Sequence, residues 1–328
     1  MTRKLRYRVD FLNGMLLSGL ALTSISGLAL LDRSIRASDS VFGAIFANML
    51  IQTFVQMRLD QLQHEAAHYK LTSSRELNDF LGHFACSIPM LSSLKSYRSF
   101  HFAHHRYLGN FSLDPEVRYY GMQHYYYHAM SRARFASNVF LDLIGFHFVQ
   151  FFCRSLIDDI KDNGYATITK IICCHLIFAI FVGFEIYALG WLLPMMTLKF
   201  ALSKIQGYSE HIIYQRPTAA TGHTVAVCGL VRFWLFPLNS HLHVVHHLVP
   251  HVPWVLLPER NQHYSRWTTI YGLWGHHGLF RRLVMADHST GSARDLGNTS
   301  NDTSTHQLTQ LGNNAGICQL SHDVRLDI

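Results

Sequence analysis

Long stretches without charged residues are the feature that most restricts what this chain can fold into. Residues 11–31 contain no charge, and these 21 residues are enough to cross the hydrocarbon core of a bilayer as a helix. Residues 41–57 form a shorter uncharged run with three amide side chains. Residues 168–200 form an almost continuous apolar run, about twice the length of one span, whose only acid is Glu185. Gly190 and Pro194 interrupt the longer run. The sequence therefore predicts four transmembrane helices in two hairpins.

The composition agrees with a membrane protein. Charged residues make up 15% of the chain, against about 25% in a typical soluble domain. The net charge of +7 does not indicate nucleic-acid binding, because the sequence has no basic stripe with interleaved aromatic residues and no nucleic-acid-binding module. We attribute the excess of basic residues to contacts with anionic lipid headgroups.

Basic residues near the N-terminus predict the orientation in the membrane. Four of them lie within the first eight positions, whereas the segment 32–40 balances two acids with two bases. The positive-inside rule then places the N-terminus in the cytoplasm, and two hairpins return the chain to that side each time. The chain turns polar from about Ala286. We therefore expect a multi-pass membrane domain over residues 1–285 and a disordered tail over 286–328, with both termini cytoplasmic.

Histidines gather in three groups outside the predicted spans, all on the expected cytoplasmic side. The groups are His64 with His68, then His101, His104 and His105, then His243, His246 and His247. On a helix, residues at i, i+3 and i+4 share one face, so each group is expected to aim its imidazoles in one direction. Neutral imidazole suits iron, copper, nickel and zinc, so the groups predict a metal centre. Asp60, one turn before His64, is the candidate to accept the second N–H of a ligand imidazole.

Two other kinds of metal site compete for the first group. The five residues HEAAH match the H-E-x-x-H motif of zinc metalloproteases, in which Glu65 would be the general base and His64 and His68 zinc ligands. That interpretation needs a third ligand, for which Asp142 is the candidate, and it leaves the other two groups unexplained. A carboxylate-rich di-iron site needs two Glu-x-x-His motifs, and Glu65 to His68 is the only one in the sequence.

The three groups together resemble the integral-membrane fatty acid desaturase family, which includes related hydroxylases and ketolases. Members carry histidine boxes of the forms HxxxH, HxxHH and HxxHH on the cytoplasmic side of four spans. The segment RSFHFAHHRYLGNFSLDPE resembles the second box with its downstream Asp114-Pro115, and NSHLHVVHHLVPHVPW resembles the third box with its upstream Asn239. The resemblance covers roughly residues 7–276.

This resemblance implies a fold and a set of ligands. The fold is all-α, with the boxes on a cytoplasmic helical cap below the four spans. The eight box histidines are expected to be catalytic and, together with one further histidine after the fourth span, to bind two irons. His211 stands at the matching position of that further ligand, and Asn239 is a candidate for a group beside the metal.

The expected reaction is O₂-dependent desaturation. Breaking an unactivated C–H bond requires a strong oxidant made from O₂ at reduced iron, and a dry apolar channel to hold the chain. Removal of two hydrogens gives a C=C bond in a fatty acyl chain or related aliphatic substrate. The alternatives are a hydroxylase or ketolase with the same metal site, and, in a different class, a membrane zinc metalloprotease.

Electrons for this reaction must come from another protein. The sequence contains no G-x-G-x-x-G nucleotide fingerprint and no fused cytochrome-like or ferredoxin-like segment. We therefore expect a separate donor of the ferredoxin, cytochrome or flavoprotein type. The other expected partners are the membrane and a lipid or acyl substrate.

Overall fold

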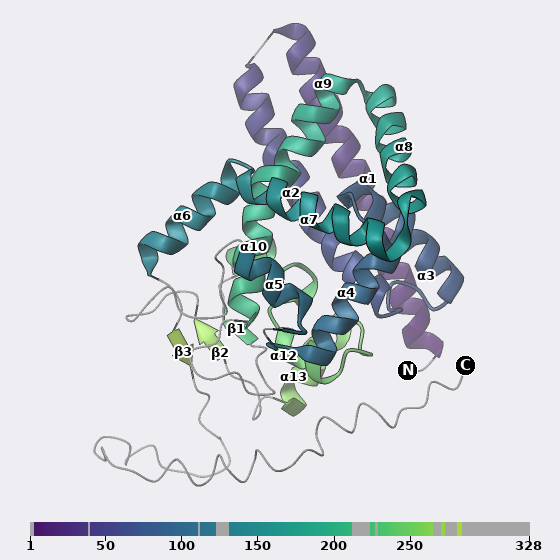
Figure 1. Cartoon of the computed structure of the whole chain (residues 1–328). Helices are drawn as coiled ribbons and strands as arrows, with labels where there is room; N and C mark the ends of the chain where they lie inside the picture. Colours follow the sequence, from purple (N-terminus) through teal and green to yellow (C-terminus); the bar gives the residue numbers. More distant parts are fainter. Residues whose placement is uncertain are drawn as a thin grey trace. The chain divides into compact units, whose positions relative to one another are not determined.

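Helices make up nearly all of the structure, a computed structural model that describes residues 3–38, 40–110, 112–122, 131–211, 224–226, 229–264, 270–272 and 281–283 (Figure 1). The α-helices in these ranges are α1 (Arg3–Ala37), α2 (Val41–Ala67), α3 (Arg75–Leu81), α4 (Leu94–Tyr107), α5 (Pro115–Met122), α6 (Arg132–Leu143), α7 (Phe146–Asn163), α8 (Tyr165–Val182), α9 (Phe184–Ile186), α10 (Phe200–His211), α11 (Gly229–Leu235), α12 (His243–Leu248) and α13 (Leu257–Tyr264). The predicted tail, residues 286–328, and with it the predicted domain boundary, lies outside the described residues.

Shorter helical segments connect several of these helices. Three are π-helices, η1 (Gly82–Ser87), η3 (Tyr187–Leu192) and η4 (Met195–Lys199), and three are 3₁₀ turns, η2 (Ile88–Met90), η5 (Pro237–Asn239) and η6 (Trp254–Leu256). The all-α prediction is correct for the described residues except in one detail. A small sheet of three strands, β1 (Thr224–Ala226), β2 (Ile270–Gly272) and β3 (Arg281–Leu283), has β1 parallel to β2 and β2 antiparallel to β3.

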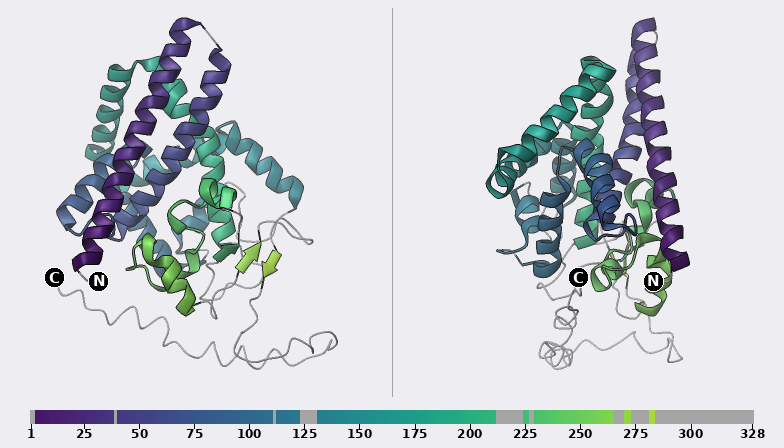
Figure 2. Two further views of the ribbon diagram at one scale, coloured as in Figure 1. Left: turned by 180° about the vertical axis from the view of Figure 1, so that it is seen from behind. Right: turned by 90° about the vertical axis from the view of Figure 1, so that its right-hand side faces the viewer.

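Three helical stretches in the described part of the chain are long and apolar enough to cross a membrane. They are Leu5–Ala37, Tyr165–Val182 and Phe184–His211, and the bent pair Ala133–Leu143 and Phe146–Lys161 adds a fourth if the pair counts as one broken span. The predicted span at residues 41–57 is helical within α2, which packs beside α1 (Figure 2). Polar residues along α2 keep it from being apolar enough by itself.

The break between the last two apolar helices lies at Gly183. This residue has φ 93°, a conformation that glycine adopts without a Cβ clash, and it separates α8 from α9. The prediction that Gly190 and Pro194 interrupt the long apolar run was therefore wrong. Both lie inside the continuous helical stretch from Phe184 to His211, which widens into π-helical turns at η3 and η4.

Buried amide side chains on α2 complete the hydrogen bonding of this widened helix. Pro194 has no N–H, so the carbonyl of Gly190, four residues earlier, lacks its usual helical donor. Asn48 Nδ2 donates to that carbonyl at 2.9 Å, and Gln56 Nε2 donates to the carbonyl of Trp191 at 2.9 Å. The polar face of α2 therefore faces the interior of the helical bundle, because it supplies donors that the neighbouring helix needs.

Asn48→Leu is expected to destabilise the protein by about 1–2 kcal/mol, because it removes a buried hydrogen bond to the Gly190 carbonyl. The measurement is thermal and denaturant unfolding of the purified protein in one detergent. Phe46→Leu on the same helix is the matched control, since Phe46 is 62% exposed. Equal loss of stability in the two variants would contradict this account of the amide.

A packed apolar core joins the helices that carry the first two histidine boxes. Gly82 begins η1 directly against α2, where an added Cβ would lie 2.5 Å from Ala66 Cβ and 2.9 Å from Leu94 Cδ2. The buried residues of this core come from α1, α2, η1, α4 and η3, and they include Leu20, Leu59, Leu62, Ala66, Cys86, Leu94 and Trp191. This close packing fixes the start of α4 relative to the C-terminal end of α2.

Candidate metal centre

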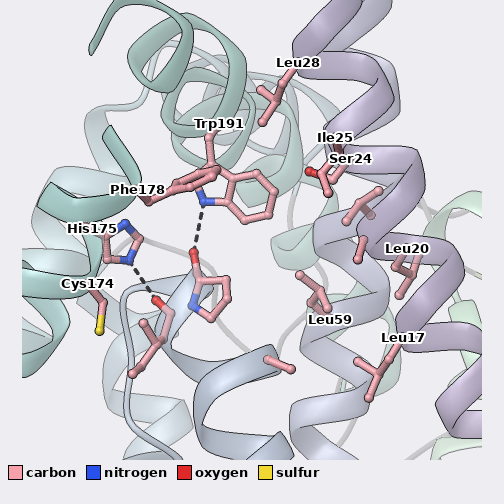
Figure 3. A pocket seen from close by; sticks show the side chains of 15 residues that line it. Leu17, Leu20, Ser24, Ile25, Leu28, Leu59, Cys174, His175, Phe178 and Trp191 are labelled. Carbon is pink, nitrogen blue, oxygen red and sulfur yellow. Dashed lines mark hydrogen bonds between the residues drawn. The ribbon is translucent and has the colours of Figure 1, made fainter. Parts of the chain in front are cut away.

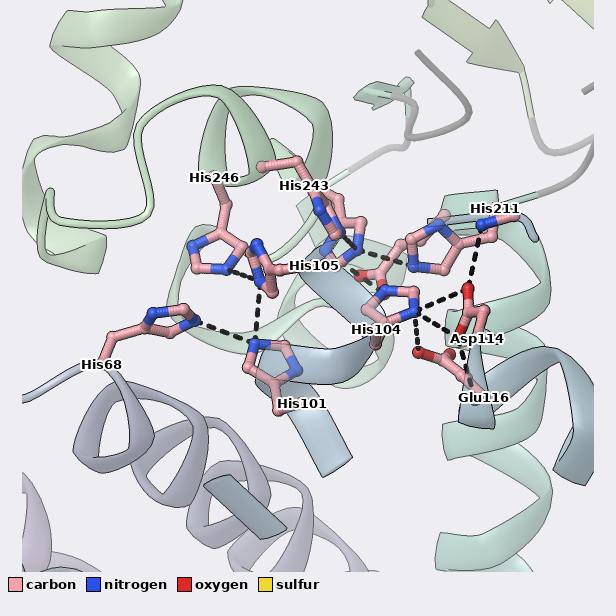
Figure 4. Close-up of polar contacts among 12 residues, drawn as sticks. His68, His101, His104, His105, Asp114, Glu116, His211, His243 and His246 are labelled. Carbon is pink, nitrogen blue, oxygen red and sulfur yellow. Dashed lines mark hydrogen bonds and ion pairs between the residues drawn. The ribbon is translucent and has the colours of Figure 1, made fainter. Parts of the chain in front are cut away.

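Four helices bring their histidine-bearing ends together (Figure 4). His64 lies in the last turn of α2 and His68 caps that helix, the second box lies on α4, and the third box makes up most of α12. His211 is the last residue of α10. The structure thus places all of the histidines singled out in the sequence around one region, although they come from segments far apart in the chain.

These histidines form two clusters rather than three. Cluster A consists of His64, His68, His101, His105 and His246, and cluster B consists of His104, His211, His243 and His247. Within each cluster, one side-chain nitrogen from every residue lies within 4.8 Å of the others. Each cluster therefore has enough nitrogen atoms at close range to hold one metal ion.

The two HxxHH boxes divide their histidines between the clusters in opposite ways. In the second box, His101 and His105 enter cluster A and His104 enters cluster B. In the third box, the outer pair enters cluster B and His246 enters cluster A. The expectation that each box aims its imidazoles in one direction is therefore wrong for these two boxes, although it holds for the first box, whose His64 and His68 both enter cluster A. Adjacent residues point about 100° apart on a helix, so neighbouring histidines diverge while the i, i+4 pair converges.

Distances within the clusters fit a bound metal ion. In cluster A, the Nε2 atoms of His68 and His105 both lie 2.9 Å from His101 Nε2, and His246 Nε2 lies 3.1 Å from His105 Nε2. In cluster B, His243 Nε2 lies 2.8 Å from His211 Nε2. Nitrogen ligands at about 2.1 Å from one ion and at right angles to each other are about 3.0 Å apart.

Two buried ring nitrogens give a second test of that fit. His64 Nε2 and His104 Nε2 are buried and have no hydrogen-bond partner among the described residues. A buried acceptor without a hydrogen-bond partner lowers the stability of the fold by about 1–3 kcal/mol. Such an atom therefore indicates a site where a ligand binds. One of these nitrogens belongs to each cluster, and a cation in each would satisfy both.

Burial prepares the histidines of cluster A to act as ligands. Desolvation, followed by repulsion from neighbouring imidazoles, holds the pKa values of His68, His101, His105 and His246 well below the ordinary value. The pKa of His247 in cluster B is lowered for the same reasons. Metal binding requires neutral imidazole, so these side chains need not release a proton near neutral pH.

Two carboxylates hold His104 in one orientation. Its Nδ1 lies 3.0 Å from Asp114 Oδ1 and 3.2 Å from Glu116 Oε2. Desolvation alone would lower the pKa of His104, but the two carboxylates outweigh it and raise the pKa. Ionised carboxylates can only accept hydrogen bonds, so His104 donates its Nδ1–H to them, which leaves Nε2 as the ligand atom in cluster B.

The backbone in turn positions Asp114. Its carboxylate accepts the N–H groups of Gly109 and Glu116, each at 2.9 Å, and Pro115 begins α5. Asp before Pro at a helix start is a common N-cap arrangement. From the sequence, Asp114 was predicted only as part of the flank of the second box, and no role was predicted for Glu116. The acidic pair around Pro115 was the available signal.

The geometry does not favour a zinc protease site. Glu65 Oε2 accepts the backbone N–H of Trp254 at 3.0 Å, so the would-be general base is engaged with the backbone. Asp142, the candidate third ligand, lies 2.6 Å from His147 Nδ1 and belongs to neither cluster. His64 and His68 instead share their cluster with histidines from the other two boxes.

Asp60 and Asn239 each interact with residues outside the two clusters. Asp60 pairs with Lys199 Nζ at 2.5 Å and accepts a weak hydrogen bond from Ser203 Oγ at 3.5 Å. Asn239 has φ 61°, which Asn tolerates better than most residues, and its Nδ2 donates to the carbonyl of Trp254 at 3.2 Å. Their supporting role at a metal remains a prediction.

Comparison with known proteins adds one finding to this geometry. The family model described as fatty acid desaturase matches residues 40–277, which is more than half of the chain. The matched region begins at the start of α2 and includes the histidines of both clusters. A comparison with curated proteins gives no match.

Proposed function

The chain belongs to the fatty acid desaturase family, and from that membership we propose that it is an O₂-dependent di-iron desaturase acting on a fatty acyl chain or a related aliphatic substrate. Membership implies an oxidoreductase, and the resemblance seen in the sequence is thereby confirmed at the level of the family. The reaction and the metal are our proposal. The observation that supports them most is that each HxxHH box contributes histidines to both clusters. Together with His64, His68 and His211, the boxes thus form two clusters made entirely of imidazole side chains.

Each cluster would hold one iron through its imidazole nitrogens. When bound, the two irons supply, with O₂ and external electrons, the oxidising power that a C–H bond of an alkane requires. The protein orients the ligand imidazoles and keeps water away from them. Asp114 and Glu116 hold a proton on His104 Nδ1 and keep its Nε2 aimed into cluster B, and burial of His101, His104 and His246 excludes water from the ligands.

We propose that the clusters face the cytoplasm and that both termini lie there. The basic N-terminal segment supports this orientation through the positive-inside rule. The helical ends that carry His64 and His211 are both C-terminal ends, so α2 and α10 reach the clusters from the same side. A separate electron donor would then approach from the cytoplasm, while the acyl substrate comes from the membrane.

The test is mass spectrometry of lipids and small metabolites from cells that express the wild type or His247→Ala. The expected wild-type product is lighter than its precursor by two hydrogen atoms and is absent from the variant. A product heavier by one oxygen atom would instead identify a hydroxylase with the same metal site. Absence of any oxidised product in aerated, iron-replete cells that contain a reductant would contradict the proposal.

A further inference from the structure

Three hydrogen bonds from separate parts of the chain meet at Trp254, the residue that begins η6 after the third histidine box. Its backbone N–H donates to Glu65 Oε2 at 3.0 Å, and its indole Nε1 donates to Asn13 Oδ1 at 3.0 Å. Its carbonyl accepts a hydrogen bond from Asn239 Nδ2 at 3.2 Å. Trp254 therefore connects the segment after the third box to α1 and to the helix that carries the first box.

The hydrogen bond between Asn239 and Trp254 closes a loop around the third box. Asn239 ends η5 before α12, and Trp254 follows α12, so this bond joins the two ends of the segment 239–254, the third-box loop. Apolar side chains of this loop and of the start of α13 form a small core of their own, which consists of Leu242, Val244, Val245, Val249, Val252 and Leu257. The loop is therefore a compact unit, and its placement decides where the three histidines of the box lie.

The two ends of the third-box loop are held by helices that serve different clusters. Near its start, Gln206 Nε2 on α10 donates to Ser240 Oγ at 3.1 Å, and α10 supplies His211 to cluster B. At its end, Trp254 donates to Glu65, which lies on α2 between the two residues that this helix supplies to cluster A. The bonds at Trp254 thus fix the loop relative to the first box.

A buried amide extends these contacts to the first helix. Asn13 lies on α1, and its Nδ2 donates to the carbonyl of Leu71 at 2.9 Å, just after the first box. Its Oδ1 accepts the indole N–H of Trp254. One side chain therefore joins α1, the segment after the first box and the segment after the third box. Loss of a partner in such a buried site is costly, because water does not replace it.

We propose that Trp254 is a positioning residue for the metal centre, which holds the third box against the first so that His246 enters cluster A beside His64 and His68. Among the described residues, no hydrogen bond joins Trp254 to a cluster histidine, so it acts through the third-box loop. Groups that support a metal ligand contribute about 10- to 100-fold to metal affinity. This inference rests on metal binding at the clusters, as in the proposed function.

The test is Trp254→Phe, which keeps an aromatic ring and both backbone hydrogen bonds and removes the indole N–H. In the metal-free full-length protein, the amides of α12 are expected to exchange hydrogen about tenfold faster than in the wild type. In the iron-loaded protein, a chelator is expected to remove iron about tenfold faster. The exchange measurement needs no metal, so it separates a failure of this inference from a failure of the proposed function. Wild-type rates in either measurement would overturn the proposal.

Trp191→Phe is the matched control, because it removes the same kind of hydrogen bond in another part of the molecule. Trp191 Nε1 donates to the carbonyl of Pro89 at 3.0 Å, beside an apolar pocket whose described lining includes no histidine of either cluster (Figure 3). This variant is expected to leave hydrogen exchange in α12 and the loss of iron at wild-type rates. Equal acceleration in the two variants would indicate a general loss of stability and would contradict the role of Trp254.

A double-variant cycle tests whether Asn13 is the partner through which the indole acts. Asn13→Leu removes the acceptor of the indole N–H, so combining it with Trp254→Phe should accelerate hydrogen exchange in α12 no further than Asn13→Leu alone. Independent effects that multiply in the double variant would contradict a shared hydrogen bond.

Discussion

Replacing His104 with alanine is expected to reduce product formation by more than about 100-fold, because loss of a ligand exceeds the 10- to 100-fold cost of losing a group that supports one. The variant removes an imidazole from cluster B and leaves the nitrogens of cluster A in place. Iron content is therefore expected to fall by about half. The measurements are product yield by mass spectrometry and iron per chain by elemental analysis.

The structure makes this prediction specific to one cluster. His101→Ala, three residues away on the same helix, removes a ligand of cluster A instead, so its iron signal should differ from that of His104→Ala in Mössbauer spectra. His251→Ala is the matched control, since this residue is exposed and belongs to neither cluster. Identical spectra for the two ligand variants, or full activity in either, would refute the division into clusters A and B.

Asp114→Asn is expected to lower product formation 10- to 100-fold without unfolding the protein. The amide still accepts backbone N–H groups and still suits the start of α5, so the local backbone should persist. What disappears is the negative charge beside His104 Nδ1, which favours the proton on that nitrogen. Iron binding in cluster B should weaken as Nε2 loses its fixed orientation.

Asp79→Asn is the matched control for that variant. Asp79 pairs with Arg98 on α4, the helix that carries His104, but it contacts no cluster histidine among the described residues. Arg98 also donates to the carbonyls of Ala66 and Ala67, so α4 should stay in place. If Asp114→Asn bound iron and turned over like Asp79→Asn, the carboxylate would have no part in positioning His104.

Several features were predictable because they depend on local sequence. Spacing of three and four residues identified the histidines of the boxes, whereas His211 was identified only by the resemblance to the desaturase family. The apolar runs at 11–31 and 168–200 correspond to helices that can cross a membrane. In both cases the prediction concerns a single helix. Its period of 3.6 residues fixes which of its own side chains lie close together, so no contact with another segment has to be known.

Other features depended on contacts between distant segments. The polar side chains of α2 gave no sign of their partners, because Asn48 donates to the carbonyl of Gly190 across 142 positions of sequence separation. The break at Gly183 rather than Gly190 follows from packing, since an added Cβ at Gly190 would lie 2.5 Å from Leu28 Cδ2. Glycine there permits close helix contact, whereas at Gly183 it permits the turn.

The sequence by itself determined which residues can be ligands and that the helices between them are apolar enough for a membrane. Only the tertiary structure decided how the ligands are divided between the two clusters. His104 lies in a different cluster from His101 and His105, and His246 lies in a different cluster from His243 and His247. The reason is physical. Helical spacing sets the angle between two histidines on one helix. The packing of α2, α4, α10 and α12 sets which imidazoles of the other helices each of these histidines contacts.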